Sequence, residues 1–252
     1  MTKTIKKLLY KLLGKENYLK LLNKSFFFLY HTGLLKSTGG YRYHYFVKRL
    51  IKPGDTVVDI GANLGYFTGL FSKWVGDSGK VIAIEPVPLY TNIIRWATGS
   101  RKNIRLYPYA LGKENKKVFL VTPDHFGYLR TGLPFIYEGK NNKEISDYEF
   151  SFEAEMKKAS DLFAGFEKID YVKCDIEGYE EVVIPEILPA LIKFKPIIQI
   201  ETWGDHKPVV ESLLTGAGFE KYYLAGQELK KAAAGDQDPE GDLIFIHKEK
   251  LL

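Results

Sequence analysis

The chain contains 252 residues, of which 45% are hydrophobic, 27% are charged and 14% are aromatic, and its net charge is +5. This composition excludes a disordered chain, and the length suits one large α/β domain with an appendage. The small positive charge comes partly from the lysine-rich first fifty residues and does not indicate a nucleic-acid-binding face.

The single cysteine, Cys174, excludes an intrachain disulfide framework and a cysteine-rich zinc site. A reducing, cytoplasmic location is therefore expected. We expect no secretory signal, because lysines and Glu16 interrupt every apolar run near the N-terminus. The longest such run, residues 26–30, is far too short to cross a bilayer.

Residues 1–30 place leucines at a helical period with lysines between them, at Leu8, Leu9, Leu12, Leu13, Leu21 and Leu22. We predict one or two helices that pack on the main domain. The alternative is a basic amphipathic helix on a membrane surface, which would suit a lipid-linked substrate. Residues 39–46 alternate aromatic and polar side chains and are expected to cover the sheet. Residues 1–50 are thus predicted to form a helical and aromatic appendage to a domain over 51–252.

From residue 54 onward, apolar strands and helices alternate, which predicts a mostly parallel sheet with helices on both faces. The last two strands have a short, turn-rich connection, which favours an antiparallel pair at one edge. An irregular insertion over 123–154 breaks the alternation and is expected to be a lid, a binding loop or a spacer. The predicted strands are 56–60, 80–85, 104–109, 117–122, 169–174, 196–201, 219–224 and 242–247, and the predicted helices are 64–75, 88–98, 155–163, 178–193 and 206–216.

A glycine turn follows the first predicted strand. Asp59 closes that strand, and Gly61 and Gly65 stand four residues apart before a helix begins. Glycines allow the backbone to approach a ligand closely, although a plain strand-to-helix turn is the alternative. Asn63 stands where the dinucleotide fingerprint has its second glycine, so the turn suits a cation or hydroxyls better than a pyrophosphate.

A second acidic residue closes the next strand. Glu85 lies 26 residues after Asp59, and Pro86 follows it. A carboxylate at this place can accept both hydroxyls of a ribose, and the alternative is a surface glutamate that ends a strand. Together, the two motifs predict a nucleoside site with no need for phosphate.

More carboxylates follow the strands at 169–174 and 196–201, at the edge where open parallel sheets bind ligands. Asp175 and Glu177 are two residues apart, so on an extended segment they point the same way. They could serve as a general base or hold a divalent cation, and the alternative is that one of them caps the helix over 178–193. Glu201 ends an apolar strand, and His206 is either a general base, a hydrogen-bond donor to substrate or a solvated loop residue.

Four sequence blocks form a recognisable combination of motifs: 58–65, 85–86, 109–112 and 173–180. In these blocks the chain resembles the FkbM family of methyltransferases, over roughly residues 41–224. The resemblance implies a class I, Rossmann-like methyltransferase fold that binds S-adenosylmethionine. By the same resemblance, the methionine half of the cofactor would lie among Asp59, Gly61, Asn63 and Gly65 with Ala62 in the same loop, the ribose hydroxyls would lie at Glu85, and the adenine would lie at Tyr109 and Ala110.

The resemblance also implies O-methylation of a hydroxyl on a sugar, a glycan or a glycosylated natural product. Our hypothesis is that Asp175 or Glu177 is the base and that Glu201 and His206 orient the acceptor. A variant of this hypothesis, which resembles catechol-type O-methyltransferases, uses Asp175 and Glu201 as ligands of a divalent metal. Acceptor specificity is expected to lie in residues 1–45 and 123–154.

Three rival functions stay open at this point. An NAD(P)-dependent oxidoreductase is disfavoured by Asn63. A methyltransferase that modifies bases would have Asn/Asp-Pro-Pro-aromatic where this chain has residues 175–178. A non-catalytic binding module that keeps the same fold is disfavoured by the acidic edge.

Overall fold

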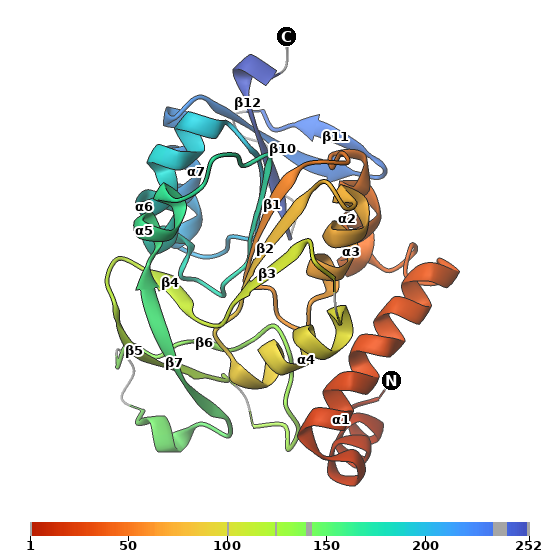
Figure 1. Cartoon of the computed structure of the whole chain (residues 1–252). Helices are drawn as coiled ribbons and strands as arrows, with labels where there is room; N and C mark the ends of the chain where they lie inside the picture. Colours follow the sequence, from red (N-terminus) through yellow and green to blue (C-terminus); the bar gives the residue numbers. More distant parts are fainter. Residues whose placement is uncertain (1, 100, 124, 140–142, 234–240, 251–252) are drawn as a thin grey trace.

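A computed structural model describes residues 2–99, 101–123, 125–139, 143–233 and 241–250. Among these residues, one sheet has eight strands in the order β11-β10-β12-β9-β8-β1-β2-β3 (Figure 1). The strands β3, β2, β1, β8 and β9 are all parallel to their neighbours in this series, so their carboxyl ends meet at one edge. The strands are β1 (Thr56–Ile60), β2 (Lys80–Ile84), β3 (Ile104–Tyr107), β8 (Tyr171–Cys174), β9 (Ile197–Ile200), β10 (Phe219–Ala225), β11 (Glu228–Lys231) and β12 (Leu243–His247).

Helices cover both faces of this sheet, as predicted, and the fold is α/β and Rossmann-like. In Figure 1 the helices α5, α6 and α7 lie on one side of the sheet, and α2, α3 and α4 lie on the other. The helices are α1 (Lys3–Thr32), α2 (Arg42–Phe46), α3 (Tyr66–Val75), α4 (Pro88–Thr98), α5 (Ala159–Ala164), α6 (Glu180–Phe194) and α7 (His206–Gly216).

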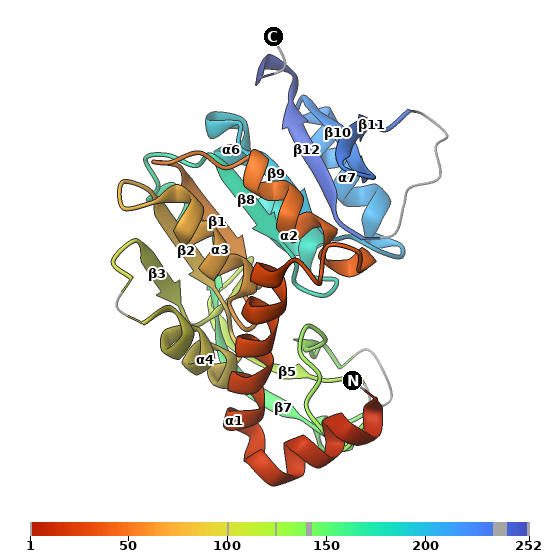
Figure 2. The same ribbon diagram turned by 90° about the vertical axis from the view of Figure 1, so that its right-hand side faces the viewer.

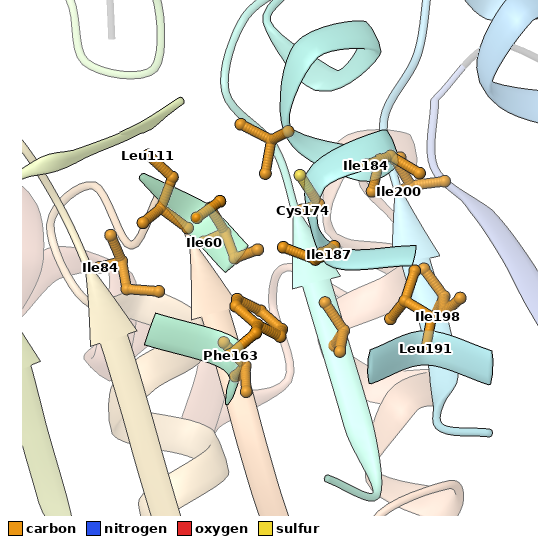
Figure 3. Packing of buried hydrophobic residues seen from close by; sticks show 14 of the residues in the cluster. Ile60, Ile84, Leu111, Phe163, Cys174, Ile184, Ile187, Leu191, Ile198 and Ile200 are labelled. Atoms are coloured by element: carbon orange, nitrogen blue, oxygen red, sulfur yellow. The ribbon is translucent and has the colours of Figure 1, made fainter. Parts of the chain in front are cut away.

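The alternation of side chains along β1 explains why both faces are buried. Val58 and Ile60 pack into the cluster beneath α5 and α6, whereas Val57 packs against α3 on the other face. Figure 3 shows isoleucines of the parallel strands meeting Ile184, Ile187 and Leu191 of α6. Cys174 is buried in the same cluster as a free thiol, and burial raises its pKa well above the ordinary value.

The antiparallel pair at the C-terminal end of the chain is confirmed. β12 is antiparallel to β10 on one side and to β9 on the other. The outermost strand is β11, which the sequence did not predict and which pairs antiparallel with β10. It lies in the turn-rich connection, of which residues 234–240 are outside the described part of the chain.

A second sheet has the order β4-β7-β5-β6 in the described residues and lies beyond the carboxyl edge of the first (Figure 2). Its strands are β4 (Ala110–Gly112), β5 (Lys116–Val121), β6 (Phe135–Ile136) and β7 (Ser151–Lys158). The predicted strand 117–122 is therefore real, but its expected place in the main sheet was wrong. The predicted helix 155–163 was half wrong, because residues up to Lys158 extend β7 and only α5 is helical. Residues 124 and 140–142 of the predicted insertion lie outside the described residues.

The helix α1 is one element with a kink at Gly14, whose φ of 72° and ψ of 168° are not helical. It runs along the side of the molecule past α3 and α4, and its N-terminal half turns toward the second sheet (Figure 2). Tyr18 and Leu19 are buried in a cluster with Tyr90 of α4 and Tyr128 of the insertion. None of the helices within the described residues combines the length and apolar character that a membrane-spanning segment needs.

Candidate active site

A pocket lies where the carboxyl edge of the main sheet meets the second sheet. Its floor comes from the loops after β1, β2 and β8, through Gly61, Glu85 and Asp175. Its roof comes from Leu120 of β5 and from the insertion. The pocket holds about 650 Å³ of empty space, part of which is open to solvent.

The glycine turn allows two protein loops to approach each other. Gly61 has a φ of 80°, and a Cβ built on it would lie 1.8 Å from the carbonyl oxygen of Asp175. Gly65 has a φ of 78° directly before α3, and its Cβ would lie 3.1 Å from the Ile94 side chain. The sequence predicted glycines that admit a ligand, but the nearest atoms belong to the protein itself. Gly61 lines the pocket, whereas Gly65 does not.

Glu85 is fixed in the pocket wall by two backbone amides. Its Oε2 accepts the N–H of Asn63 at 2.7 Å, and its Oε1 accepts the N–H of Val87 at 2.8 Å. Each oxygen keeps a further lone pair, so the carboxylate can still accept two hydroxyl groups. Burial raises the pKa of Glu85 to about 8, against the lowering effect of the two amides.

The other predicted cofactor residues of this loop divide into two groups. Asn63 lines the pocket in a left-handed conformation with a φ of 53°, and its buried Oδ1 has no hydrogen-bond partner among the described residues. Asp59 and Ala62 are buried behind the pocket wall and do not line it. Asp59 accepts a hydrogen bond from the Thr68 hydroxyl at 2.6 Å, and burial raises its pKa.

Tyr109 and Ala110 both line the pocket, and their role in binding adenine stays a prediction. The insertion also contributes, since Gly132 and Pro134 line the pocket and a Cβ on Gly132 would lie 3.2 Å from Nδ2 of Asn63. The residues of the insertion that line the pocket are small or aliphatic. The sequence did not single out several residues of the wall, namely Tyr90, Leu120, Ile136 and Tyr179.

Asp175 and Glu177 both line the pocket, although the segment between them is a turn and not an extended strand. Asp175 Oδ2 accepts a hydrogen bond from the buried ammonium of Lys173 at 2.8 Å. Glu177 has a φ of 56°, a left-handed conformation that is costly for a residue with a side chain and that clusters at functional sites. Burial raises the pKa of Glu177 to about 8, and the charges of Asp175 and Glu201 add to this effect.

The helix-capping alternative finds no support at α6. The residue before this helix is Tyr179, and no side chain makes a capping hydrogen bond there within the described structure. Glu180 instead fixes the preceding turn, because its Oε1 accepts the N–H of Ile176 at 2.9 Å. Asp175 and Glu177 are therefore available to the pocket.

Glu201 and His206 lie beside the pocket and not in its wall. Burial raises the pKa of Glu201 to about 7, and Asp175 is the next largest cause. His206 Nδ1 lies 2.7 Å from Oε2 of Glu181, so the imidazole is held at the start of α7 by a carboxylate. Trp203, which the sequence did not assign, is 53% exposed between them, and its ring would lie 3.3 Å from a Cβ on Gly178.

The protein-family model described as "Methyltransferase FkbM domain" matches residues 59–221, which is more than half of the chain. The chain belongs to the FkbM methyltransferase family. It is therefore an S-adenosylmethionine-dependent methyltransferase, and the oxidoreductase and the non-catalytic module are set aside.

Individual relatives of this FkbM methyltransferase are distant. It is 26% identical over 196 residues to methyltransferase sdnD of Sordaria araneosa, covering 65% of this chain and 73% of that protein. A methyltransferase FkbM structure from Methylobacillus flagellatus matches with a TM-score of 0.47 and 13% identity, over 80% of this chain and 50% of that one. An rRNA-methylase structure described as putative, from Clostridium thermocellum, matches with a TM-score of 0.48 and 13% identity, over 81% and 91% of the two chains.

The side chains of this FkbM methyltransferase fit its cofactor. The free lone pairs of Glu85 suit ribose hydroxyls, and the unpaired Oδ1 of Asn63 suits an ammonium group. The carboxylates of Asp175 and Glu177 suit a sulfonium cation. The described residues contain no group of three or more His, Cys, Asp or Glu side chains placed to hold a metal ion.

Proposed function

We propose that this FkbM methyltransferase transfers a methyl group from S-adenosylmethionine to a hydroxyl of a sugar, a glycan or a glycosylated natural product. The observation that carries the proposal is the group of carboxylates at the pocket, with Glu177 in a strained conformation beside Asp175 and near Glu201. A hydroxyl is a weak acid, so a nearby carboxylate that accepts its proton assists its attack. A negatively charged acceptor, such as a carboxylate or a nucleic acid, would be repelled from this edge.

In this proposal the cofactor lies along the carboxyl edge from Tyr109 to Glu177. Tyr109 and Ala110 hold the adenine, Glu85 accepts the ribose hydroxyls, and the turn at Gly61 and Asn63 faces the methionine half. Asp59, Ala62 and Gly65 support that turn from behind, through their buried positions and backbone conformation. When bound, S-adenosylmethionine would supply an electrophilic methyl group for the acceptor oxygen.

We assign the general base to Glu177 rather than to Asp175. Asp175 is ion-paired with Lys173 at 2.8 Å, so one of its oxygens is already engaged and the carboxylate suits an orienting role. The raised pKa of Glu177, about 8, matches the proton-accepting task at neutral pH much better than an ordinary carboxylate would. A bound sulfonium would favour the ionised form of Glu177, so the base would be charged when the methyl donor is present.

Trp203 supports a sugar as the acceptor. Its indole is 53% exposed beside the backbone of Gly178, directly after the proposed base. The apolar face of a pyranose ring packs well on an indole, while its hydroxyls require acceptors such as Glu201. His206, held by Glu181 at 2.7 Å, then orients the acceptor from the outer side.

The direct test is to incubate the protein with labelled S-adenosylmethionine and a panel of glycans, lipid-linked sugars and small polyols. The expected product is a methyl ether on a sugar hydroxyl, and transfer only to nitrogen, carboxyl or nucleic acid would contradict the proposal. Addition of a chelator separates the metal variant, in which Asp175 and Glu201 are ligands, from the metal-free mechanism. We expect activity to persist with the chelator.

The location of the protein is part of the same proposal. The free, buried thiol of Cys174 is consistent with a reducing, cytoplasmic compartment. Fractionation of cells that express the chain, with recovery outside the cytoplasm and its membrane surface, would contradict this assignment.

A further inference from the structure

The N-terminal half of α1 exposes a row of large apolar side chains. Ile5, Leu8 and Leu12 are 46%, 56% and 71% exposed, and their spacing of three and four residues places them on one side of the helix. Single exposed leucines are ordinary, but a row of three on one helix is not. Seven of the twelve exposed large apolar side chains in the described residues lie between Ile5 and Leu34.

The opposite side of the same helical segment is anchored, so the exposed row has a fixed direction. Leu9 and Tyr10 pack against the cluster that contains Tyr18 and Tyr128. The ring of Tyr10 meets those of Tyr18 and Phe150 edge-on, at 5.3 and 6.1 Å. The helix thus rests on the insertion with one face and presents the other outward, at the end of the molecule seen at the bottom of Figure 2.

The charge of the chain is concentrated in the same segment. Residues 1–36 contain eight lysines and one acidic residue, Glu16, a net charge of +7, whereas the whole chain carries +5. The rest of the protein is therefore slightly negative, at −2. Glu16 is itself paired with Lys20 at 2.6 Å. Lys3 lies over the Phe126 ring at 5.1 Å and Lys7 lies against Gly127, both on the insertion side of the helix, whereas Lys11 is exposed one residue before Leu12 of the apolar row.

We propose that this outer face of α1 binds the surface of an anionic lipid bilayer. An exposed apolar row with lysines in the same turns is the arrangement of a helix that lies in the membrane interface, with its apolar side chains below the headgroups. The lysines add electrostatic attraction to anionic headgroups. A soluble acidic partner would explain the lysines but would leave the apolar row in water.

The helix α1 is also connected to the pocket, because the cluster of side chains beneath it shares residues with the pocket wall. Tyr90 and Leu120 belong both to the cluster under α1 and to the pocket wall. A bilayer held at the outer face of α1 would therefore be separated from the pocket by α1 and this cluster. If the proposed function holds, this position suits an acceptor sugar carried on a lipid, although the membrane contact itself does not depend on the acceptor.

The test is co-sedimentation of the full chain with vesicles, without cofactor or acceptor. Phosphatidylcholine vesicles that contain phosphatidylglycerol should bind the protein, pure phosphatidylcholine vesicles should bind it weakly, and added salt should release it. The double variant Leu8→Gln, Leu12→Gln should reduce the partition coefficient by about 100-fold, since burial of one leucine is worth at least about ten-fold. The variant Lys11→Gln should reduce it by about five-fold.

A matched control is available on the far helices. Ile192 and Val209 are 46% and 54% exposed in an apolar groove between α6 and α7 that no lysine lines. The double variant Ile192→Gln, Val209→Gln should leave vesicle binding unchanged. All variants should melt as the parent does, because each replaced side chain is exposed.

Three results would overturn the proposal. The first is failure of the parent protein to bind anionic vesicles. The second is full binding by the Leu8→Gln, Leu12→Gln variant. The third is a dimer in light scattering that this variant converts to a monomer, because a second copy of the chain would then be the occupant of the apolar row. None of these results depends on methyl transfer, so the proposed function is tested separately.

Discussion

The closest backbone approach at the candidate site makes Gly61→Ala the most informative perturbation. A Cβ at this position would lie 1.8 Å from the Asp175 carbonyl oxygen, so one of the two must move by about 1.2 Å to restore 3.0 Å. The φ of 80° adds about 1–2 kcal/mol for a residue with a side chain. The displacement also strains the 3.1 Å hydrogen bond from Asp175 N–H to Ile60 O, worth about 1 kcal/mol. We expect a total loss of about 3 kcal/mol in the free energy of unfolding.

That loss should lower the melting temperature by about 6–12 °C for a chain of this size, which differential scanning calorimetry measures. Because Asp175 lines the pocket beside the proposed base, its displacement by about 1 Å should also reduce kcat/KM about 100-fold. Gly33→Ala is the matched control, since Gly33 has a φ of 79° and its nearest new contact is an ordinary 3.7 Å to Lys36. It should lose about 1–2 kcal/mol of stability and no activity. Equal stability losses in the two variants, with full turnover in both, would refute the reasoning.

Three further predictions concern the carboxylates and the indole beside them. Trp203→Ala should raise the KM for a sugar acceptor about ten-fold without changing S-adenosylmethionine affinity by calorimetry, whereas the exposed control Trp96→Ala should change neither. Glu177→Gln should lower kcat at least about 100-fold and remove the rise of kcat/KM through pH 8. In the parent protein, kcat should rise at a lower pH than kcat/KM does. If the pH profiles of kcat and kcat/KM coincide in the parent, the proposed base is contradicted. The pKa of Glu85 is raised from 4.5 to about 8 in the folded state, because burial favours the protonated carboxyl. Below pH 4.5 Glu85 is protonated in both states, and its contribution to the free energy of unfolding is complete. As the pH rises from 4.5 through 8, the free energy of unfolding should fall by about 5 kcal/mol. Glu85→Gln should flatten that part of the denaturation profile while weakening cofactor binding, and an unchanged slope would count against a buried carboxyl here.

Much of the main sheet was predictable because its strands are short apolar runs bounded by turn residues. The carboxyl ends of parallel strands must meet, so the positions of Gly61, Glu85 and Asp175 in the chain already predict that they lie together. The predicted positions of these residues were correct, but the predicted reason why Asp175 and Glu177 lie together was not. Asp175 and Glu177 share the pocket through a left-handed turn, and not through the alternation of a strand.

The second sheet shows where local sequence preference fails. Residues 153–158 are Glu, Ala, Glu, Met, Lys and Lys, all of which are good helix formers, and yet they extend β7. Six residue pairs between β7 and β5 provide the ladder that overrides this preference. The residues of the pocket roof were not predictable either, because their place depends on this second sheet. Gly132 lies beside Asn63, and Pro134 lines the same pocket, because that sheet folds the insertion back over the carboxyl edge.

The acidity of the pocket is itself an argument for the kind of ligand it binds. Burial raises the pKa of Glu85 and of Glu177 to about 8, and Asp175 contributes to both effects. Lys173 neutralises Asp175 but leaves Glu85 and Glu177 costly to ionise in the protein without its ligand. A cation placed between them would favour the ionised forms and recover that free energy on binding. A pyrophosphate would increase the cost, so the same carboxylates that destabilise the empty fold select a sulfonium nucleoside over a dinucleotide.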